Sequence, residues 1–439
     1  MRPLRFPILL AAATLALAAP ASAELSRAEE AMSETVDAQF PAAMTLLERM
    51  VNQNSGTHHA EGVRAVAEML RPEFEALGLQ VEWIDQTAAQ RSGHLFIRND
   101  GRAGTTKMLL VAHLDTVFEP NSPFQRFEWD GRSDTATGPG INDDKGGIIT
   151  ILLALQAMKA AGTLEHASII VALTGDEESA GDPIAIARAD LVEAAEWADV
   201  ALDFEGLATQ NGRDMGVIAR RSSNGWTLRA SGRTGHSSQI FARSMGDGAV
   251  YEIARILARF RTELAEPNAT FNVGLLASGA ELAVSEDGLS AEASGKGNII
   301  PETAYASGDL RTLSEDQTDR LVTAMEAIAA DNAPGTTAEF TFHRRYPAMP
   351  PTEGNRALLG RLNAVNRDLG LEEQAEFDPA MRGAGDINFV AGQVDALAGM
   401  GPGGFGSHAA GETVDLPSIR RQAKRAAILM SRLAAQPYP

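Results

Sequence analysis

Short apolar runs alternate with longer amphipathic segments along most of the chain. The runs are five to seven residues long and rich in valine, isoleucine, leucine and alanine, which is typical of buried strands. The strands predicted in this way are 80–84, 94–98, 108–112, 168–174, 198–204 and 394–400. The predicted helices around them are 26–52, 60–77, 146–160 and 419–433. Apolar strands that alternate with helices predict an α/β domain whose mostly parallel sheet is flanked by helices on both faces.

The pattern changes in the middle of the chain, where strands and helices follow in the order β-α-β-β-α-β. The strands expected there are 226–230, 271–277, 303–310 and 339–343, and the helices are 248–264 and 315–331. Ser314, followed by Gln317 three residues later, has the pattern of a capping box at the start of the second helix. This order predicts a ferredoxin-like α+β domain inserted into the first domain. The expected division is 24–221 and 345–439 for the catalytic domain and 222–344 for the insertion.

The first 23 residues have the pattern of a secretory signal peptide. Arg2 and Arg5 precede an apolar stretch, residues 8–19, and small residues follow up to Ala23. The apolar stretch is too short to span a membrane. The sequence therefore predicts cleavage after Ala23 and a secreted or periplasmic protein.

Composition narrows the functional classes further. The chain of 439 residues carries a formal net charge of -20 and contains no cysteine. An acidic chain without a Lys/Arg run is not expected to bind nucleic acid or an anionic membrane. Without thiolates, any bound metal must be held by histidine, aspartate and glutamate.

Histidines and carboxylates gather just after the ends of the predicted strands. They are His113, Asp115, Asp143, Asp144, Asp176, Glu177, Glu178, Asp203, Glu205 and His408. Taken singly, each has a simpler explanation, such as a hydrogen-bonded surface pair or a solvated acidic turn. Ligands of open α/β sheets, however, bind at the carboxyl ends of the strands, and so many carboxylates together would repel one another. Their joint occurrence favours a site for zinc or a similar divalent ion.

Six short motifs then give a resemblance that covers nearly the whole mature chain. They are "HLDTV", "GPGINDDKGG", "DEE", "GRTGHSS", "GNIIPETA" and "GFGSH". In order and spacing they resemble the co-catalytic zinc hydrolases, which include glutamate carboxypeptidases of the carboxypeptidase G type, aminoacylases, and deacylases of acetylornithine and succinyl-diaminopimelate. The resemblance implies a fold of the zinc-exopeptidase type, with the insertion serving as a lid and dimerisation domain.

The resemblance implies a ligand set for two Zn²⁺ ions per chain, with Co²⁺ or Mn²⁺ as alternatives. His113 and Glu205 would hold one ion, Glu178 and His408 would hold the other, and Asp143 would bridge the two. The peptide bond after Asp143 is expected to be cis, as it is at the bridging aspartate of that family.

The same resemblance assigns roles around the metals. Asp115 would accept the second ring N–H of His113, and Glu177 would be the general base that activates the water held between the ions. In the insertion, His236 would act on the substrate, usually from the neighbouring subunit, while Asn298 and Arg311 would bind the polar end of the substrate. These roles imply a homodimer formed through the inserted domain.

Three departures from the family pattern bear on the substrate. Gly206 follows Glu205 where many members have proline, Tyr346 stands where some carboxypeptidases have an arginine, and "HSSQ" replaces the usual glycine-containing run after His236. The last two weaken any expectation of glutamate specificity.

The expected function is hydrolysis of a peptide or amide bond, with a small peptide or N-acyl amino acid as substrate. Secretion favours a carboxypeptidase that scavenges peptides outside the cytoplasm. An N-acyl amino acid deacylase, which is aminoacylase-like, is the alternative, because both substrates present the same acyl–NH–CH–carboxylate group. A protein that binds metal or peptide without catalysis is a third reading, but every expected ligand and Glu177 are in place.

Overall fold

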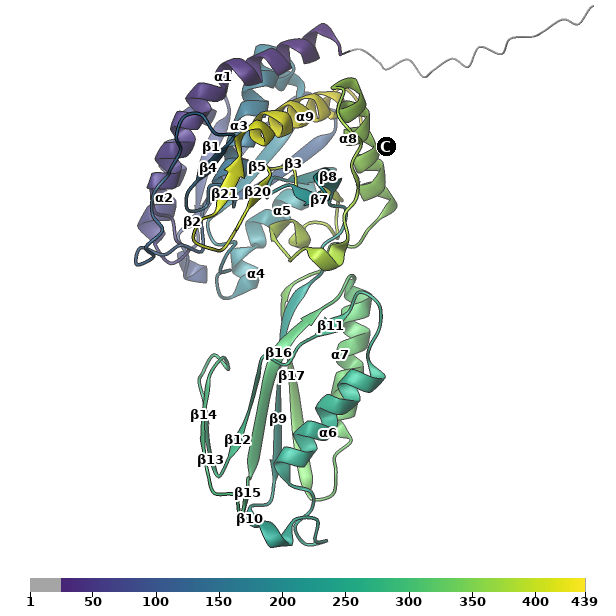
Figure 1. Cartoon of the computed structure of the whole chain (residues 1–439). Coiled ribbons are helices and arrows are strands. Elements are labelled where there is room, and N and C mark those ends of the chain that lie inside the picture. The colour runs from purple at the N-terminus through teal and green to yellow at the C-terminus, as the bar shows by residue number, and fades with distance from the viewer. Residues whose placement is uncertain (1–24, 439) are drawn as a thin grey trace, which may run out of the picture.

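The chain folds into two bodies, which are connected by two neighbouring chain segments (Figure 1). We keep for them the names catalytic domain and lid, which express the roles expected from the sequence. The structure is a computed structural model that describes residues 25–438, so the predicted signal peptide lies outside the described residues. None of the helices between residues 25 and 438 has both the length and the apolar character needed to cross a bilayer.

The catalytic domain is built on a six-stranded sheet in the order β1-β2-β5-β3-β6-β19. Its strands are β1 (Gln80–Asp85), β2 (Gly93–Asn99), β5 (Ser168–Thr174), β3 (Lys107–His113), β6 (Val200–Asp203) and β19 (Asp395–Leu397). The last four of these run parallel to one another, whereas β2 is antiparallel to β5 and β1 is antiparallel to β2. The predicted α/β class with a mostly parallel sheet is confirmed.

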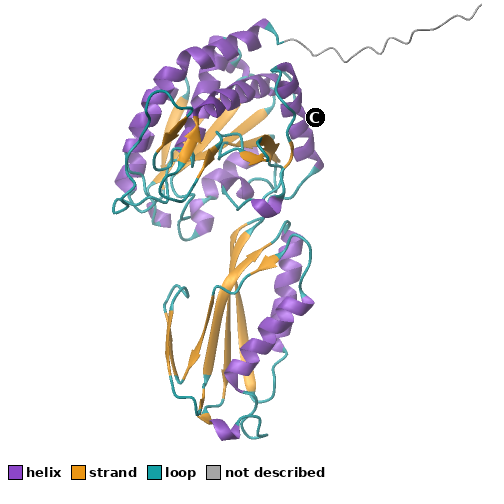
Figure 2. Ribbon diagram, in the orientation of Figure 1, coloured by secondary structure: helices purple, strands orange, loops and turns teal. Residues whose placement is uncertain are grey.

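The sheet is buried on both faces, and β3 shows why its sequence is apolar throughout. Met108, Leu110 and Ala112 pack into one core, while Leu109 and Val111 pack into the other. The first core is covered by α1 (Arg27–Asn52), α2 (Ala60–Glu75), α3 (Lys145–Ala160), α8 (Glu353–Asp368) and α9 (Leu416–Ala434). The second is covered by α5 (Ala189–Trp197) and a 3-10 helix (Asp386–Phe389). Figure 2 shows the strands lying between these helices.

The lid has one antiparallel sheet with two helices against a single face. The sheet contains β11 (Thr270–Phe271), β12 (Leu275–Gly279), β16 (Thr303–Arg311), β9 (Ser223–Gly232) and β17 (Thr336–Tyr346). The helices are α6 (Gly248–Glu263) and α7 (Glu315–Ala330). Trp226, Phe260 and Phe340 form an aromatic cluster between sheet and helices, with ring centroids 5.9–6.2 Å apart. This is the predicted ferredoxin-like arrangement.

Several elements are additional to those predicted. The expected strand 271–277 is two strands, β11 and β12, and β12 is followed by a hairpin of β13 (Glu281–Val284) and β14 (Ala291–Ser294). The helix α8 was not predicted, nor was α5. The remaining short elements are β4 (Thr135–Thr137), α4 (Ile184–Ala187), β7 (Ala208–Gln210), β8 (Arg213–Gly216), β10 (Gly235–His236), β15 (Ile299–Ile300), β18 (Ala375–Glu376), β20 (Gly404–Phe405) and β21 (Thr413–Asp415).

Candidate metal centre

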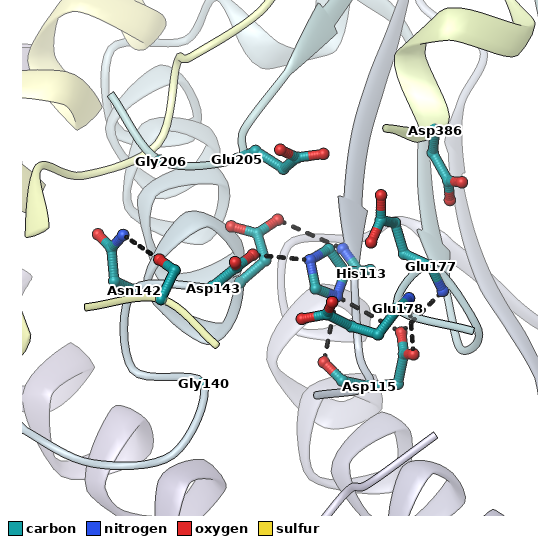
Figure 3. A network of polar contacts seen from close by, with 12 residues as sticks. His113, Asp115, Gly140, Asn142, Asp143, Glu177, Glu178, Glu205, Gly206 and Asp386 are labelled. Carbon is teal, nitrogen blue, oxygen red and sulfur yellow. Dashed lines mark hydrogen bonds and ion pairs between the residues drawn. The ribbon is translucent and has the colours of Figure 1, made fainter. Parts of the chain in front are cut away.

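The predicted metal ligands lie at the edge of the main sheet where its parallel strands end. His113 is the last residue of β3, Glu178 follows β5 and Glu205 follows β6. Asp143 lies just before α3, and His408 reaches the same edge from the loop between β20 and β21. Figure 3 shows His113, Asp143, Glu178 and Glu205 around one space. The shared polarity of parallel strands therefore brings ligands together from distant parts of the chain.

Four of the five predicted ligands are in mutual contact. Asp143 lies between two imidazoles, with Oδ1 at 3.1 Å from Nε2 of His113 and Oδ2 at 3.2 Å from Nε2 of His408. Oε2 of Glu178 is 3.0 Å from the same Nε2 of His408. One aspartate that offers an oxygen to each histidine is arranged as a bridging ligand would be.

This group of side chains fits a divalent cation. One ligand atom from each of His113, Asp143 and Glu178 lies within 4.8 Å of the others. Oε1 of Glu178 is buried and has no hydrogen-bond partner among the described residues, although buried oxygens are normally paired. Imidazole nitrogens and carboxylate oxygens, without sulfur, suit zinc and related ions. A cation among these atoms would satisfy the unpaired oxygen.

The charge state of Asp143 also suits a ligand. Burial alone would raise the pKa of its carboxyl, but hydrogen bonds from His113 and His408 outweigh burial and hold that pKa well below its usual range. The carboxyl is therefore ionised at neutral pH, as a metal ligand must be. The Asp143–Asp144 peptide bond is cis, as expected from the sequence.

Glu205 lies across the same space and does not join the contacts of the other four ligands. Its Oε2 is 2.9 Å from Nη2 of Arg220, and Arg220 in turn is 3.2 Å from Oδ2 of Asp203. The sequence had not indicated this arginine. The place of Glu205 in a second metal site stays a prediction.

Asp115 is fully buried and supports both the histidine and the acidic turn opposite it. Its Oδ1 is 3.4 Å from Nδ1 of His113, but the closer acceptor of that ring nitrogen, at 3.1 Å, is the backbone oxygen of Asp115 itself. Its carboxylate accepts the backbone N–H groups of Glu177 and Glu178, at 3.0 and 3.2 Å, and the hydroxyl of Thr57, at 2.6 Å. Asp115 therefore fixes the histidine and both glutamates together.

Glu177 and Glu178 are neighbours whose carboxylates point in different directions (Figure 3). Glu178 contacts His408, whereas Glu177 lines a pocket of about 390 Å³ beside the ligands. Burial first, and then the charge of Glu205, raise the pKa of the Glu177 carboxyl well above its usual value. A carboxyl that holds a proton readily, and that faces the pocket, has the properties of a general base.

The loop that carries Asp143 is held by a carboxylate that the sequence did not indicate. Glu412 is buried and accepts the backbone N–H groups of Gly140, Asn142 and Asp143 at 2.8–2.9 Å. Three N–H bonds to one side chain fix the course of the backbone at this aspartate. The only sign in the sequence is an acidic residue shortly after His408.

A buried ion-pair network stabilises the turn that contains Glu177. Arg188 is 2.6 Å from Oδ1 of Asp176 and 2.8 Å from Oδ1 of Asp386. The hydroxyl of Tyr346 donates to the backbone oxygen of Glu177 at 2.8 Å. Arg188 and Asp386 were not predicted from the sequence, and Tyr346 was noted only as a departure from the family pattern.

The three predicted substrate residues of the lid lie at two different ends of it. His236 belongs to β10, which pairs with β15, and the backbone N–H of Ser237 donates to the oxygen of Asn298 at 2.9 Å. Figure 1 places β10 and β15 at the tip of the lid farthest from the catalytic domain. Arg311 lies at the end of β16, and its Nε is 2.7 Å from Oδ2 of Asp309. Within one subunit His236 is therefore far from the metal ligands, as expected from the sequence.

Comparison with known proteins places the chain among peptidases. Residues 109–432 match Peptidase family M20/M25/M40. Carboxypeptidase G2 from Pseudomonas sp. (strain RS-16) is 28% identical over 438 residues, which cover 97% of this chain and 97% of that protein.

Solved structures show the same architecture at low sequence identity. A tripeptidase from Staphylococcus aureus has a TM-score of 0.68 and 19% identity, and the match covers 90% of this chain and 99% of that one. A dinuclear metal binding peptidase of the M20 family from Bacillus subtilis has a TM-score of 0.62 and 14% identity, over 91% of this chain and 99% of that one. At these identities the likeness concerns the fold.

Proposed function

Because the chain belongs to peptidase family M20/M25/M40, whose members hydrolyse peptide or amide bonds, we propose that it is a zinc carboxypeptidase of small peptides. The observation that carries the proposal is the position of Glu177, which faces a pocket beside His113, Asp143, Glu178 and His408. A base beside a metal-ligand cluster is the arrangement that hydrolysis by a metal-activated water requires. The predicted signal peptide extends the proposal to an exported enzyme.

The mechanism assigns each step to a side chain. Divalent ions held by the ligand cluster would lower the pKa of a water from 15.7 towards about 7 and polarise the scissile carbonyl. Glu177 takes a proton from the attacking water and later delivers it to the leaving nitrogen, so that the base of the first step is the acid of the second. Asp115 keeps the backbone of Glu177 in place during both transfers.

We further propose that the active site is completed across a homodimer. The tip of the lid carries His236 and Asn298 away from the metal ligands of the same chain. In a dimer formed through the lid, His236 of the partner subunit would donate to the oxygen that becomes negative when the carbonyl is attacked. Such a donor stabilises the developing charge.

The proposed activity is tested by a substrate screen with the purified protein after loading with Zn²⁺, Co²⁺ or Mn²⁺. We expect cleavage of dipeptides with a free α-carboxylate, little cleavage of the same dipeptides as C-terminal amides, and no cleavage after chelation. Cleavage of N-acyl amino acids alone would favour the deacylase alternative. Equal cleavage of free and amidated dipeptides would contradict a carboxypeptidase.

The cross-subunit role of His236 is tested by mixing two inactive variants. His236→Ala and Glu177→Ala should each have very low activity as homodimers. After subunit exchange, a mixed dimer holds one site that has both residues, so part of the activity should return. The measurement is the rate before and after exchange, with exchange itself followed by mass spectrometry of a labelled subunit. Proven exchange without recovery would show that His236 does not act across the interface.

A further inference from the structure

One wall of the pocket is a loop whose backbone is fixed by a buried arginine. Arg220 donates from Nε to the oxygen of Gly383 at 2.7 Å and from Nη2 to the oxygen of Ala384 at 2.8 Å. It also forms the ion pairs with Asp203 and Glu205 described above. All three nitrogens of this guanidinium are engaged, and four contacts occupy most of its five N–H donors, so Arg220 mainly holds the loop and the two carboxylates in place.

The loop itself contains another arginine, Arg382, most of whose donors are not engaged. Arg382 lines the pocket, and the structure gives it one hydrogen bond, from Nη2 to the backbone oxygen of Gly206 at 2.7 Å. Its Nε is buried without a hydrogen-bond partner among residues 25–438. The nearest carboxylate oxygen is Oε2 of Glu205, at 3.6 Å, which is beyond a normal hydrogen bond. A guanidinium has five N–H donors, so most of those on Arg382 are uncommitted.

The charges in this wall of the pocket also indicate that Arg382 lacks a counter-charge. Two cations, Arg220 and Arg382, face two carboxylates, Asp203 and Glu205. Arg220 forms ion pairs with both carboxylates, at 3.2 Å from Asp203 and 2.9 Å from Glu205, and Glu205 is the carboxylate that the sequence predicts to be a metal ligand. Once Glu205 holds a metal ion, Arg382, whose side chain is 19% exposed, is a largely buried cation without a carboxylate of its own in this wall. Buried cations are normally compensated by a counter-charge.

We propose that Arg382 binds a second carboxylate of the substrate, in addition to the α-carboxylate, and so selects acidic substrates. The inference rests on the proposed function, because it concerns the pocket beside the same catalytic residues. A guanidinium can bind a carboxylate through two parallel N–H bonds, and most N–H donors of Arg382, including Nε, have no partner among residues 25–438. The second carboxylate comes either from the side chain of the leaving amino acid or from a dicarboxylic acyl group, and both carry the same chemistry.

Matched substrate pairs separate the two sources. N-acetyl-glutamate and N-acetyl-glutamine differ only in a charge on the leaving residue, and N-succinyl-alanine and its succinamoyl analogue differ only in a charge on the acyl group. In Arg382→Gln we expect kcat/KM for the charged member of one pair to fall on the order of 10–100-fold, the range expected for hydrogen bonds to a charged group. The neutral member of that pair should stay near the wild-type value. The pair that responds identifies the source.

Three further variants and readouts define the result. Arg382→Lys should keep part of the preference, because it keeps the charge but loses the paired geometry. Arg213→Gln removes an exposed arginine of the catalytic domain and should leave both pairs unchanged. Metal content is measured for every variant. Equal losses on charged and neutral substrates in Arg382→Gln, or a loss of metal, would overturn the proposal and assign Arg382 to the support of Glu205.

A binding measurement keeps this inference separate from the proposed function. If the wild-type protein cleaves none of the four substrates, binding of glutarate and butyrate is compared by calorimetry, and the proposed function is decided separately by the dipeptide screen. Glutarate has a second carboxylate and butyrate does not, so the wild-type protein should bind glutarate more tightly and Arg382→Gln should lose that difference. Equal binding of the two acids by the wild-type protein, or no binding of glutarate, would overturn the role of Arg382.

Discussion

Replacement of Glu177 by glutamine is expected to lower kcat by about 10²–10⁴-fold, the loss typical when a general base is removed. The amide keeps the size of the side chain but cannot take a proton from water. Metal content should not change, because the carboxylate of Glu177 faces the pocket while Glu178 contacts His408 at 3.0 Å. Kinetics and elemental analysis of the same preparation check both parts of the expectation.

Glu178→Gln is the matched control, because it makes the same chemical change one residue further along the chain. Its carboxylate lies within the ligand cluster, so the variant should bind metal more weakly and excess zinc should restore part of the activity. The reverse outcome, with metal lost from Glu177→Gln and retained by Glu178→Gln, would mean that the two roles are exchanged.

Asp143→Asn is expected to abolish both metal binding and activity. The aspartate presents one oxygen to His113 and the other to His408, at 3.1 and 3.2 Å, so that its two oxygens connect both sides of the site. An amide replaces one of these acceptors with a donor and removes the negative charge. Changes to residues behind a ligand already cost about 10–100-fold in metal affinity or activity, and the loss of the bridging ligand itself should exceed that range.

The measurement is metal content after dialysis against a defined zinc concentration, followed by the rate on the best substrate. Asp100→Asn, which changes an exposed aspartate of the same domain, should behave like the wild-type protein in both assays. A variant Asp143→Asn that keeps its metal and a substantial rate would exclude this aspartate as the bridge.

The sequence indicated most of the site because most of the site residues directly follow a strand, and strands can be recognised in the sequence. His113 comes at the end of an apolar run, and "GDEES" comes directly after another. Parallel strands end at one edge of a sheet, so residues far apart in the chain are predicted to be neighbours as soon as the strands are recognised. The same local patterns predicted the two domains, since the alternation of Trp226, Leu228 and Ala230 with polar residues reflects a sheet buried on one face.

The interactions that hold these residues in place could not be read in the same way. Glu412 binds the backbone at Asp143 across 269 residues of sequence, and Arg188 joins Asp386 across 198. Neither contact has a periodic signature, because a single buried ion or hydrogen-bond acceptor does not repeat along a helix or strand. The short hairpin β13–β14 escaped prediction because its strands are mostly exposed and carry little apolar pattern.

By itself, the sequence determined which chemical groups are available and which of them follow a strand, and therefore which lie at one edge of the sheet. Only the tertiary structure decided that Glu205 contacts Arg220 and that Arg382 lines the pocket with most of its donors uncommitted. The physical reason is that burial patterns are local. They follow the period of two residues in a strand and of 3.6 residues in a helix. Pairing of charges depends instead on which distant segments the completed fold brings within a few ångströms of one another.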